Sequence, residues 1–159
     1  MAKRHFRVPL ALLGLGAGAV ALAGFWSSPG RAAVAAGPGG HVPVDGYLNE
    51  MVIDAAGERA YITNPARNRV EVLVLATKTL ESPIEVGSQP LGLDFSVDGR
   101  LLYVANSGAD YVSVVDVGAR REVRRIDIPG GYFENETPYS VAVAANGQAL
   151  VTTTFPGSG

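Results

Sequence analysis

The chain has 159 residues, of which 47% are hydrophobic and 18% are charged, as in an ordinary globular protein and unlike a disordered or collagen-like one. Thirteen Lys and Arg residues stand against 15 Asp and Glu residues, and this slightly acidic balance argues against binding to nucleic acid or to an anionic membrane surface. The chain contains no cysteine, which excludes disulfides, thiolate catalysis, zinc–thiolate sites, haem attachment and a lipid-modified N-terminal cysteine.

The N-terminal segment, residues 1–35, has the pattern of a secretory signal peptide. The basic stretch MAKRHFR precedes an apolar stretch at 8–26, and Ala33-Val34-Ala35 fits the small-x-small rule of signal peptidase. We therefore expect a protein that is secreted, periplasmic or on the cell surface, with cleavage near Ala35 and a short linker at 36–40. The alternative is an uncleaved membrane anchor, because 19 apolar residues are just long enough to cross a bilayer.

The remaining residues, 41–159, contain an internal repeat. Residues 48–86 align with 90–128 at an offset of 42 without a gap. A third copy begins at Pro138, at an offset of 48 from the second, and its similarity fades after Leu150. The identical pairs in the first two copies are Gly57 and Gly99, Tyr61 and Tyr103, Asn64 and Asn106, Val70 and Val112, Val72 and Val114, and Ile84 and Ile126.

Each repeat unit is predicted to form four short antiparallel strands. In the second unit, alternating apolar residues predict strands at about 91–96, 101–106, 111–117 and 122–128. The Asp-Gly pair between the first two of these strands favours a hairpin turn. Pro83 lies in the fourth strand of the first unit, and it marks that strand as the outer edge because proline lacks an N–H group.

Four antiparallel strands that recur every 40–45 residues or so are typical of a β-propeller blade. The sequences YITN at 61–64 and YVAN at 103–106 resemble the YVTN-type β-propeller repeat, and the resemblance covers about 41–154. It implies an all-β propeller of four-stranded antiparallel blades.

The tyrosine and asparagine of this motif are expected to have structural roles. We expect Tyr61 and Tyr103 to fill the space between neighbouring blades with a large ring. Asn64 and Asn106 should end the second strand, where a side-chain amide can hydrogen-bond the backbone of the following turn.

The sequence HVPV, at 41–44, falls in register on the fourth strands of the two repeats. It predicts an N-terminal strand that completes a last blade, as in many propellers. The chain then holds this strand, two blades and about half of a third, whereas closed propellers typically have four to eight blades. We interpret the chain as the N-terminal part of a longer protein. The alternative is a short protein that completes a ring by oligomerising.

The connection PGGYFENETPYS, at 129–140, is the candidate binding loop. It contains the six residues by which the second repeat spacing exceeds the first. Such connections line the propeller face around the central channel, and loops on a rigid scaffold commonly carry function. Its aromatic rings and its carboxylates could bind a ligand, Ca²⁺ or a cationic group; the alternative is a solvent-exposed insertion with a buried aromatic anchor. The candidate residues are Tyr132, Phe133, Glu134, Glu136 and Tyr139.

The sequence contains no catalytic signature. His41 is the only histidine outside the N-terminal segment, and the motifs of serine hydrolases, zinc proteases and P-loop enzymes are absent. The basic run RREVRR, at 120–125, is interpreted as a solvated edge with acidic neighbours.

Two classes of function remain open. The first is an exported binding or scaffold protein whose partner is a protein, a glycan or a small molecule, with an undetermined cofactor. The second is part of a secreted propeller enzyme, such as a lactonase, another hydrolase or a quinone-dependent dehydrogenase, whose site residues lie beyond Gly159. The propeller could also be an accessory domain of such an enzyme.

Overall fold

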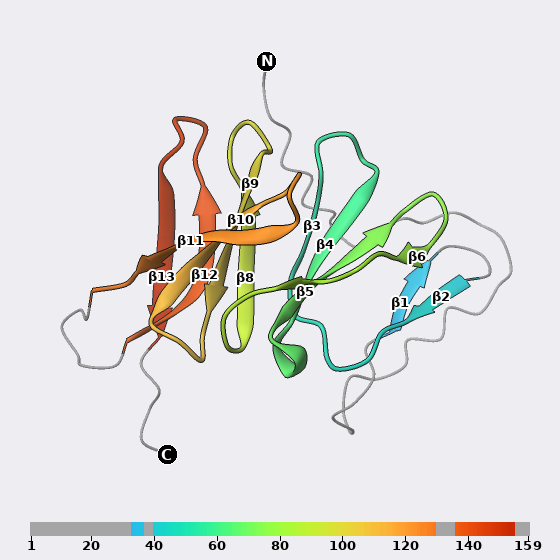
Figure 1. The fold of residues 1–159 in the computed structure, drawn as a ribbon, viewed down its shortest axis with the longest axis horizontal. Coiled ribbons are helices and arrows are strands. Elements are labelled where there is room, and N and C mark those ends of the chain that lie inside the picture. Colours follow the sequence, from blue (N-terminus) through green and yellow to red (C-terminus); the bar gives the residue numbers. More distant parts are fainter. Residues whose placement is uncertain (1–32, 37–39, 130–135, 155–159) are drawn as a thin grey trace, which may run out of the picture.

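The computed structural model describes residues 33–36, 40–129 and 136–154 (Figure 1). These ranges consist of antiparallel strands, turns and one 3-10 helix, arranged as four sheets side by side. The all-β class and the four-stranded antiparallel units that the sequence predicts are confirmed. Residues 1–32 and 37–39 lie outside the described part, so the predicted boundaries of a signal peptide and a linker stay predictions.

The first sheet is a pair of strands, β1 (Ala33–Ala36) and β2 (Gly40–Pro43), with Val34 opposite Val42. The strand β2 lies where the sequence predicts an N-terminal strand. Its Val42, together with Val44 just beyond it, is buried against the next sheet.

The second sheet, called blade 1, has its first three strands in chain order, and its fourth strand is divided in two. The division coincides with Pro83, which precedes the second piece and cannot donate a ladder hydrogen bond. Both pieces pair with the third strand. The strands are β3 (Met51–Ile53), β4 (Arg59–Asn64), β5 (Arg69–Val74), β6 (Thr79–Leu80) and β7 (Ile84–Glu85), and the 3-10 helix Pro65–Arg67 joins β4 to β5.

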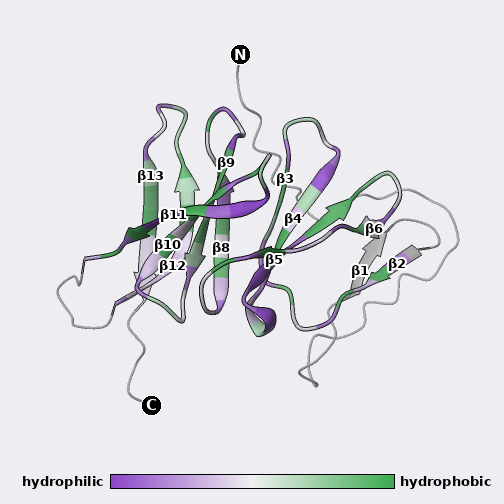
Figure 2. Ribbon diagram, viewed as in Figure 1, coloured by the Kyte–Doolittle hydropathy of each residue, from purple (hydrophilic) through white to green (hydrophobic). Residues whose placement is uncertain are grey.

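The third sheet, called blade 2, has four strands in chain order and agrees with the predicted strands to within about one residue at each end. Figure 2 shows hydrophilic residues along its outer strand, the one that carries most of the basic run. The strands are β8 (Pro90–Phe95), β9 (Leu101–Asn106), β10 (Tyr111–Asp116) and β11 (Arg121–Asp127).

The fourth sheet, called half-blade 3, consists of β12 (Thr137–Val143) and β13 (Ala149–Thr154). Its hairpin turn is one residue shorter than the turn of blade 2. In blade 2 the N–H of Ser96 donates to the carbonyl of Leu101, whereas in half-blade 3 the N–H of Ala144 donates to the carbonyl of Gln148.

The shorter turn corrects the ungapped alignment of the third repeat. Leu150 is opposite Ala142, as Tyr103 is opposite Asp94. Leu150 therefore occupies the place of Tyr103, a place that the sequence alignment gives to Val151. By the same register Thr153, opposite Pro138, occupies the place of Asn106, which is opposite Pro90.

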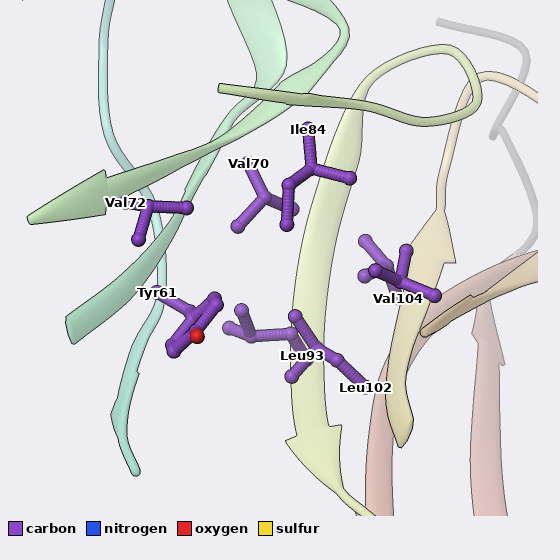
Figure 3. Packing of buried hydrophobic residues seen from close by; sticks show 8 residues of the cluster. Tyr61, Val70, Val72, Ile84, Leu93, Leu102 and Val104 are labelled. Atoms are coloured by element: carbon purple, nitrogen blue, oxygen red, sulfur yellow. The ribbon is translucent and has the colours of Figure 1, made fainter. Parts of the chain in front are cut away.

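The main hydrophobic core lies between blade 1 and blade 2 (Figure 3). Side chains from four strands of blade 1 and three strands of blade 2 interlock there, and their burial is the main favourable contribution to the packing of the two blades. Its buried members are Tyr61, Val70, Val72, Ile84, Leu93, Leu102, Val104 and Val115.

A second core lies between β2 and blade 1, and it repeats part of the first. A shift of 42 residues converts Val42, Val44 and Ala60 into Ile84, Val86 and Leu102, all members of the first core or packed against it. The strand β2 therefore covers blade 1 as the fourth strand of blade 1 covers blade 2.

Polar contacts also join neighbouring sheets. Arg120, in the last turn of blade 2, donates from Nη1 to Glu81 Oε2 at 2.8 Å and from Nη2 to the carbonyl of Ser82 at 2.6 Å. Arg59 of blade 1 donates from Nε to the same oxygen of Glu81 at 3.3 Å. Glu81 therefore lies between two guanidinium groups, one from each blade.

Candidate functional site

The turns between second and third strands and the connections between sheets lie at one end of the blades, which we call the loop face. Hydrogen bonds link the parts of this face. The N–H of Gln89 donates to Asn68 Oδ1 at 2.9 Å, and the N–H of Ser107 donates to the carbonyl of Gln89 at 3.0 Å. The turn of blade 1, the connection and the turn of blade 2 thus form a continuous bonded surface.

Asn64, the last residue of β4, lies buried beneath the loop face of blade 1. Its side chain is fully buried, and Nδ2 donates to the carbonyl of Asp45 and to Glu71 Oε1, both at 2.7 Å. Arg69 Nε donates to the same carboxylate oxygen at 2.7 Å. The sequence predicts a bond to the following turn; the amide instead binds the preceding connection and the third strand.

Asn106 has the same place in blade 2 and a different set of partners. Its Nδ2 donates to the carbonyl of Tyr111 at 3.1 Å and to Ser113 Oγ at 3.0 Å. The first of these bonds spans the turn and ends on the first residue of β10. Ser113 then donates to Glu122 Oε2 at 2.6 Å, and Arg125 Nε donates to Glu122 Oε1 at 2.6 Å.

The two networks have a common order of groups, an amide, a carboxylate and a guanidinium. Glu71 and Ser113 are equivalent by the 42-residue offset, so blade 1 takes its carboxylate from the third strand and blade 2 from the fourth. Arg125 also stacks on the ring of Tyr111, 4.5 Å from its centroid. Sequence reasoning missed these networks because it considered only the asparagines.

Each buried asparagine is packed against a glycine of a connection. A Cβ atom at Gly87 would lie 2.5 Å from Asn106 Cγ, and one at Gly46 would overlap Asn64 Oδ1. The Oδ1 atoms of both amides have no hydrogen-bond partner among the described residues. The connection can approach the end of the second strand only because it presents a bare Cα atom there.

The two motif tyrosines lie in different surroundings. Tyr61 is 4% exposed, and burial raises the pKa of its phenol. Tyr103 is half-buried and borders an open hollow of about 360 Å³ at the end opposite the loop face. Val143 of half-blade 3 lines the same hollow.

The structure describes two of the five residues of the candidate binding loop. Tyr132, Phe133 and Glu134 lie outside the described residues. Glu136 is half-buried, and its Oε2 accepts a hydrogen bond of 2.9 Å from Thr153, the residue in the place of Asn106. Tyr139 is exposed in β12.

Two acidic residues lie in the first strands or just before them, and sequence reasoning did not select them. Burial raises the pKa of Glu50, and the charge of Asp94 adds to this rise, while the N–H of Leu93 opposes it. Asp94 Oδ2 accepts a hydrogen bond of 2.8 Å from the N–H of Val143. The sequence did offer a clue to these two residues, because each is an acidic residue within or next to a first strand that is otherwise mainly apolar.

Within the ranges that the structure describes, no three His, Cys, Asp or Glu side chains are arranged to hold a metal ion. No helix in those ranges is long and apolar enough to span a membrane.

No protein-family model matches the chain, and the comparison with curated proteins found no match. Among solved structures, hydrazine synthase from Kuenenia stuttgartiensis matches with a TM-score of 0.57 and 25% identity over 64% of this chain and 27% of that one. Dihydro-heme d1 dehydrogenase NirN, solved in complex with DHE, matches with a TM-score of 0.64 and 18% identity over 73% of this chain and 25% of that one.

A third match is the WD40 β-propeller domain of the protein Doa1, with a TM-score of 0.57 and 11% identity over 68% of this chain and 34% of that one. The chain therefore spans about a quarter to a third of the length of these structures. The neighbours are β-propellers, and their sheets match the four-stranded blades described above. The chain has a β-propeller fold, with two four-stranded blades and a half-blade in its described part.

Proposed function

We propose that the protein is an exported β-propeller of the YVTN type that binds a ligand through its loop face and has a binding or scaffold role. The observation that carries this proposal is the pair of buried asparagines, Asn64 and Asn106. Asn64 links the connection at Asp45 to the third strand of blade 1, and Asn106 links the two strands that flank the turn of blade 2. A turn that is fixed from below costs less entropy to order on binding, which favours recognition.

The candidate loop at 129–140 contributes the binding groups. Aromatic rings and carboxylates together suit a glycan, because sugar rings stack on aromatic faces and sugar hydroxyls donate to carboxylates. Tyr139 is exposed, and Glu136 accepts a hydrogen bond from Thr153 that orients its carboxylate. Protein and small-molecule ligands are the other classes that this loop could serve.

The full chain on an array of soluble glycans tests the binding role. We expect saturable binding to a subset of glycans, with at least about a tenfold loss of affinity in Tyr139→Ala or Glu136→Gln, since each removes about 1.4 kcal/mol or more. Val123→Ala is the matched control, because Val123 is exposed on the outer strand β11 of blade 2. Equal loss in the control, or no binding at all, would contradict a glycan site on this loop.

Export is tested separately by the intact mass of the protein recovered outside the cytoplasm. A mass that lacks residues 1–35 supports a cleaved signal peptide. A full-length mass in the membrane fraction supports the alternative, an anchor at 8–26.

An enzyme is the second candidate, because two fold neighbours, hydrazine synthase and dihydro-heme d1 dehydrogenase, are enzymes by name. In this alternative the chain is part of a propeller lactonase, another hydrolase or a quinone-dependent dehydrogenase. Because the site residues of this alternative lie beyond Gly159, the last class is tested on the natural protein recovered from its source, incubated with pyrroloquinoline quinone and Ca²⁺ and followed by the quinone absorbance. A perturbed quinone spectrum supports it, and an unchanged one contradicts it.

A further inference from the structure

The hollow between blade 2 and half-blade 3 lies at the end opposite the loop face and has a volume of about 360 Å³. The β8–β9 turn and the β12–β13 turn lie side by side at this end (Figure 1), and residues of both line the hollow. Its position makes it separate from the candidate binding loop at 129–140. What it can hold follows from a comparison with the neighbouring interface.

The corresponding place between blade 1 and blade 2 is filled by the ring of Phe95. This ring packs against the main core and meets Tyr61 edge-on, with 5.2 Å between the two centroids. Leu102, which is opposite Phe95 in the strand ladder, is fully buried in the same core. Two large apolar side chains of blade 2 thus occupy the space in front of Tyr61.

Both of these side chains are smaller in half-blade 3. Val143 is opposite Ala149 in the ladder, as Phe95 is opposite Leu102, so a valine replaces the phenylalanine and an alanine replaces the leucine. Tyr103, the equivalent of Tyr61, therefore has no phenyl ring of half-blade 3 to meet. The hollow is the space that these two large-to-small replacements leave beside Tyr103.

Both replacements lie in β12 and β13, so they belong to the protein whatever sequence follows residue 159. A further strand paired with β13 would add a wall to the hollow on that side and would leave the valine in β12 unchanged. The lining residues also lie far along the chain from the N-terminal segment. Cleavage of a signal peptide therefore does not alter the hollow.

The walls of the hollow suit an aromatic ring. They include the side chains of Leu101, Tyr103 and Val143, and an apolar space left by a large-to-small replacement takes up small aromatic molecules. A bound ring in the place of the missing phenyl ring can meet Tyr103 edge-on, an arrangement that aromatic pairs favour. The volume is near the lower end of the range of small-molecule sites, about 300–1,000 Å³, which suits one ring with a short side arm.

The rim of the hollow carries a negative charge on Asp98. Asp98 Oδ1 accepts hydrogen bonds from Ser96 Oγ at 2.6 Å and from the N–H of Arg100 at 3.0 Å. These bonds, with a smaller effect from the charge of Arg100, lower the pKa of the carboxyl, so it is ionised at neutral pH. In the part of the chain that the structure describes, Asp98 forms no salt bridge. Its charge is therefore available to a cationic group on a ligand.

We propose that this hollow is a second ligand site, in which a small aromatic amine places its ring between Tyr103 and Val143 and its ammonium group on the carboxylate of Asp98. An aromatic acid would bring a second negative charge to the same rim, so the amine is the favoured class. The proposal goes beyond binding at the loop face. Because the two sites lie at opposite ends of the blades, failure of one leaves the other untouched.

Titration of the full-length protein with phenethylamine, followed by ligand-observed NMR, tests this site. Phenethyl alcohol, which is neutral and similar in shape, and phenylacetate, which is anionic, are the comparison probes. We expect the amine to bind about fivefold more tightly than the alcohol, the size of effect expected of a partly exposed ion pair, and phenylacetate to bind more weakly than either. Asp98→Asn should remove the preference for the amine while the alcohol still binds.

Val143→Phe should abolish the binding of all three probes, because it restores the ring that fills the corresponding place between blade 1 and blade 2. Its melting temperature should equal or exceed that of the natural protein, since the new ring enters an open space. Val143→Leu should weaken binding by a smaller factor. Val123→Phe is the matched control, because Val123 is exposed on the outer strand β11, and it should leave binding unchanged.

Four results would overturn the proposal. They are no saturable binding of the amine to the natural protein, a preference for the amine that persists in Asp98→Asn, binding that survives Val143→Phe, and an equal loss in the control. A melting temperature of Val143→Phe well below that of the natural protein would also overturn it, because the protein itself would then fill the hollow.

Discussion

The ring of Tyr61 meets the ring of Phe95 edge-on, with 5.2 Å between the centroids and 86° between the planes. Tyr61 belongs to blade 1 and Phe95 to blade 2, so this contact joins two blades through side chains alone. The edge-to-face arrangement places the positive rim of one ring on the negative face of the other. The motif tyrosine is thus a contact between blades in the first repeat.

Tyr61→Ala should lower the free energy of unfolding by about 3–5 kcal/mol, because it leaves a cavity in the main core. Tyr103→Ala should cost clearly less, since Tyr103 is only half-buried. Urea denaturation of the full chain measures both values. Tyr61→Phe is the control for the hydroxyl and should cost less than about 1.5 kcal/mol, as expected of a volume-conserving change. Equal losses at Tyr61 and Tyr103 would contradict this interpretation.

Gly87→Ala should destabilise the protein by about 1–3 kcal/mol, because its Cβ atom would overlap the side chain of Asn106. Asn106→Ala should also destabilise it by about 1–3 kcal/mol, because two buried acceptors lose their donor. The double variant should cost less than the sum, since the smaller side chain makes room for the new methyl group. Chemical denaturation of the three variants completes the cycle, and strict additivity would contradict the contact.

Glu50→Gln should stabilise the protein at neutral pH. The pKa of Glu50 is raised in the folded state, so its ionisation costs stability once the pH exceeds the folded pKa, and the cost is absent below the ordinary glutamate pKa. The glutamine stays neutral and keeps an oxygen for the N–H of Leu93. Melting temperatures from about pH 4 to about pH 8 should therefore diverge in favour of the variant as the pH rises. A natural chain that gains on the variant with rising pH would contradict this.

Glu81→Gln should have the opposite pH dependence. Hydrogen bonds from Arg59, together with the charge of Arg120, lower the pKa of Glu81. Its contribution to stability is present above the ordinary glutamate pKa and is lost as the pH falls through the lowered folded pKa. The variant should melt earlier than the natural chain at neutral pH and approach it in acid. Added salt should shrink the difference because the group is solvent-accessible; a difference that persists in acid would contradict the ion pair.

The strands of blade 2 could be predicted from the sequence because their signals, the alternation of apolar residues and the Asp98-Gly99 turn, each lie within a short stretch of the chain. The register of half-blade 3 could not, because the loss of one turn residue shifts Leu150 into the place of Tyr103 without any mark in the alignment. A one-residue shift in a strand exchanges its two faces.

The polar part of the candidate site was harder to predict. Asn64 and Asn106 were identified from the repeat, but their networks include groups that the repeat does not mark. Asp45, 19 residues before Asn64, accepts from it directly, and Glu122 joins the network of Asn106 only through Ser113. Such hydrogen bonds depend on how closely separate parts of the backbone approach one another, and no local sequence pattern shows that distance.

Tyr139 is exposed although Val141 and Val143, two and four residues further along β12, are buried. The ladder with β13 shifts register between Pro138 and Ser140, so regular alternation does not predict the exposure of Tyr139.

The separate origin of the carboxylate in each blade has a consequence for how such repeats can recombine. Glu71 comes from the third strand and Glu122 from the fourth, with Ser113 relaying the contact. An exchange of the fourth strand alone would bring a second acid into one blade and leave Ser113 without its acceptor in the other. Whole blades are therefore the units that gene duplication can copy without loss, and a crossover inside a blade breaks its polar network.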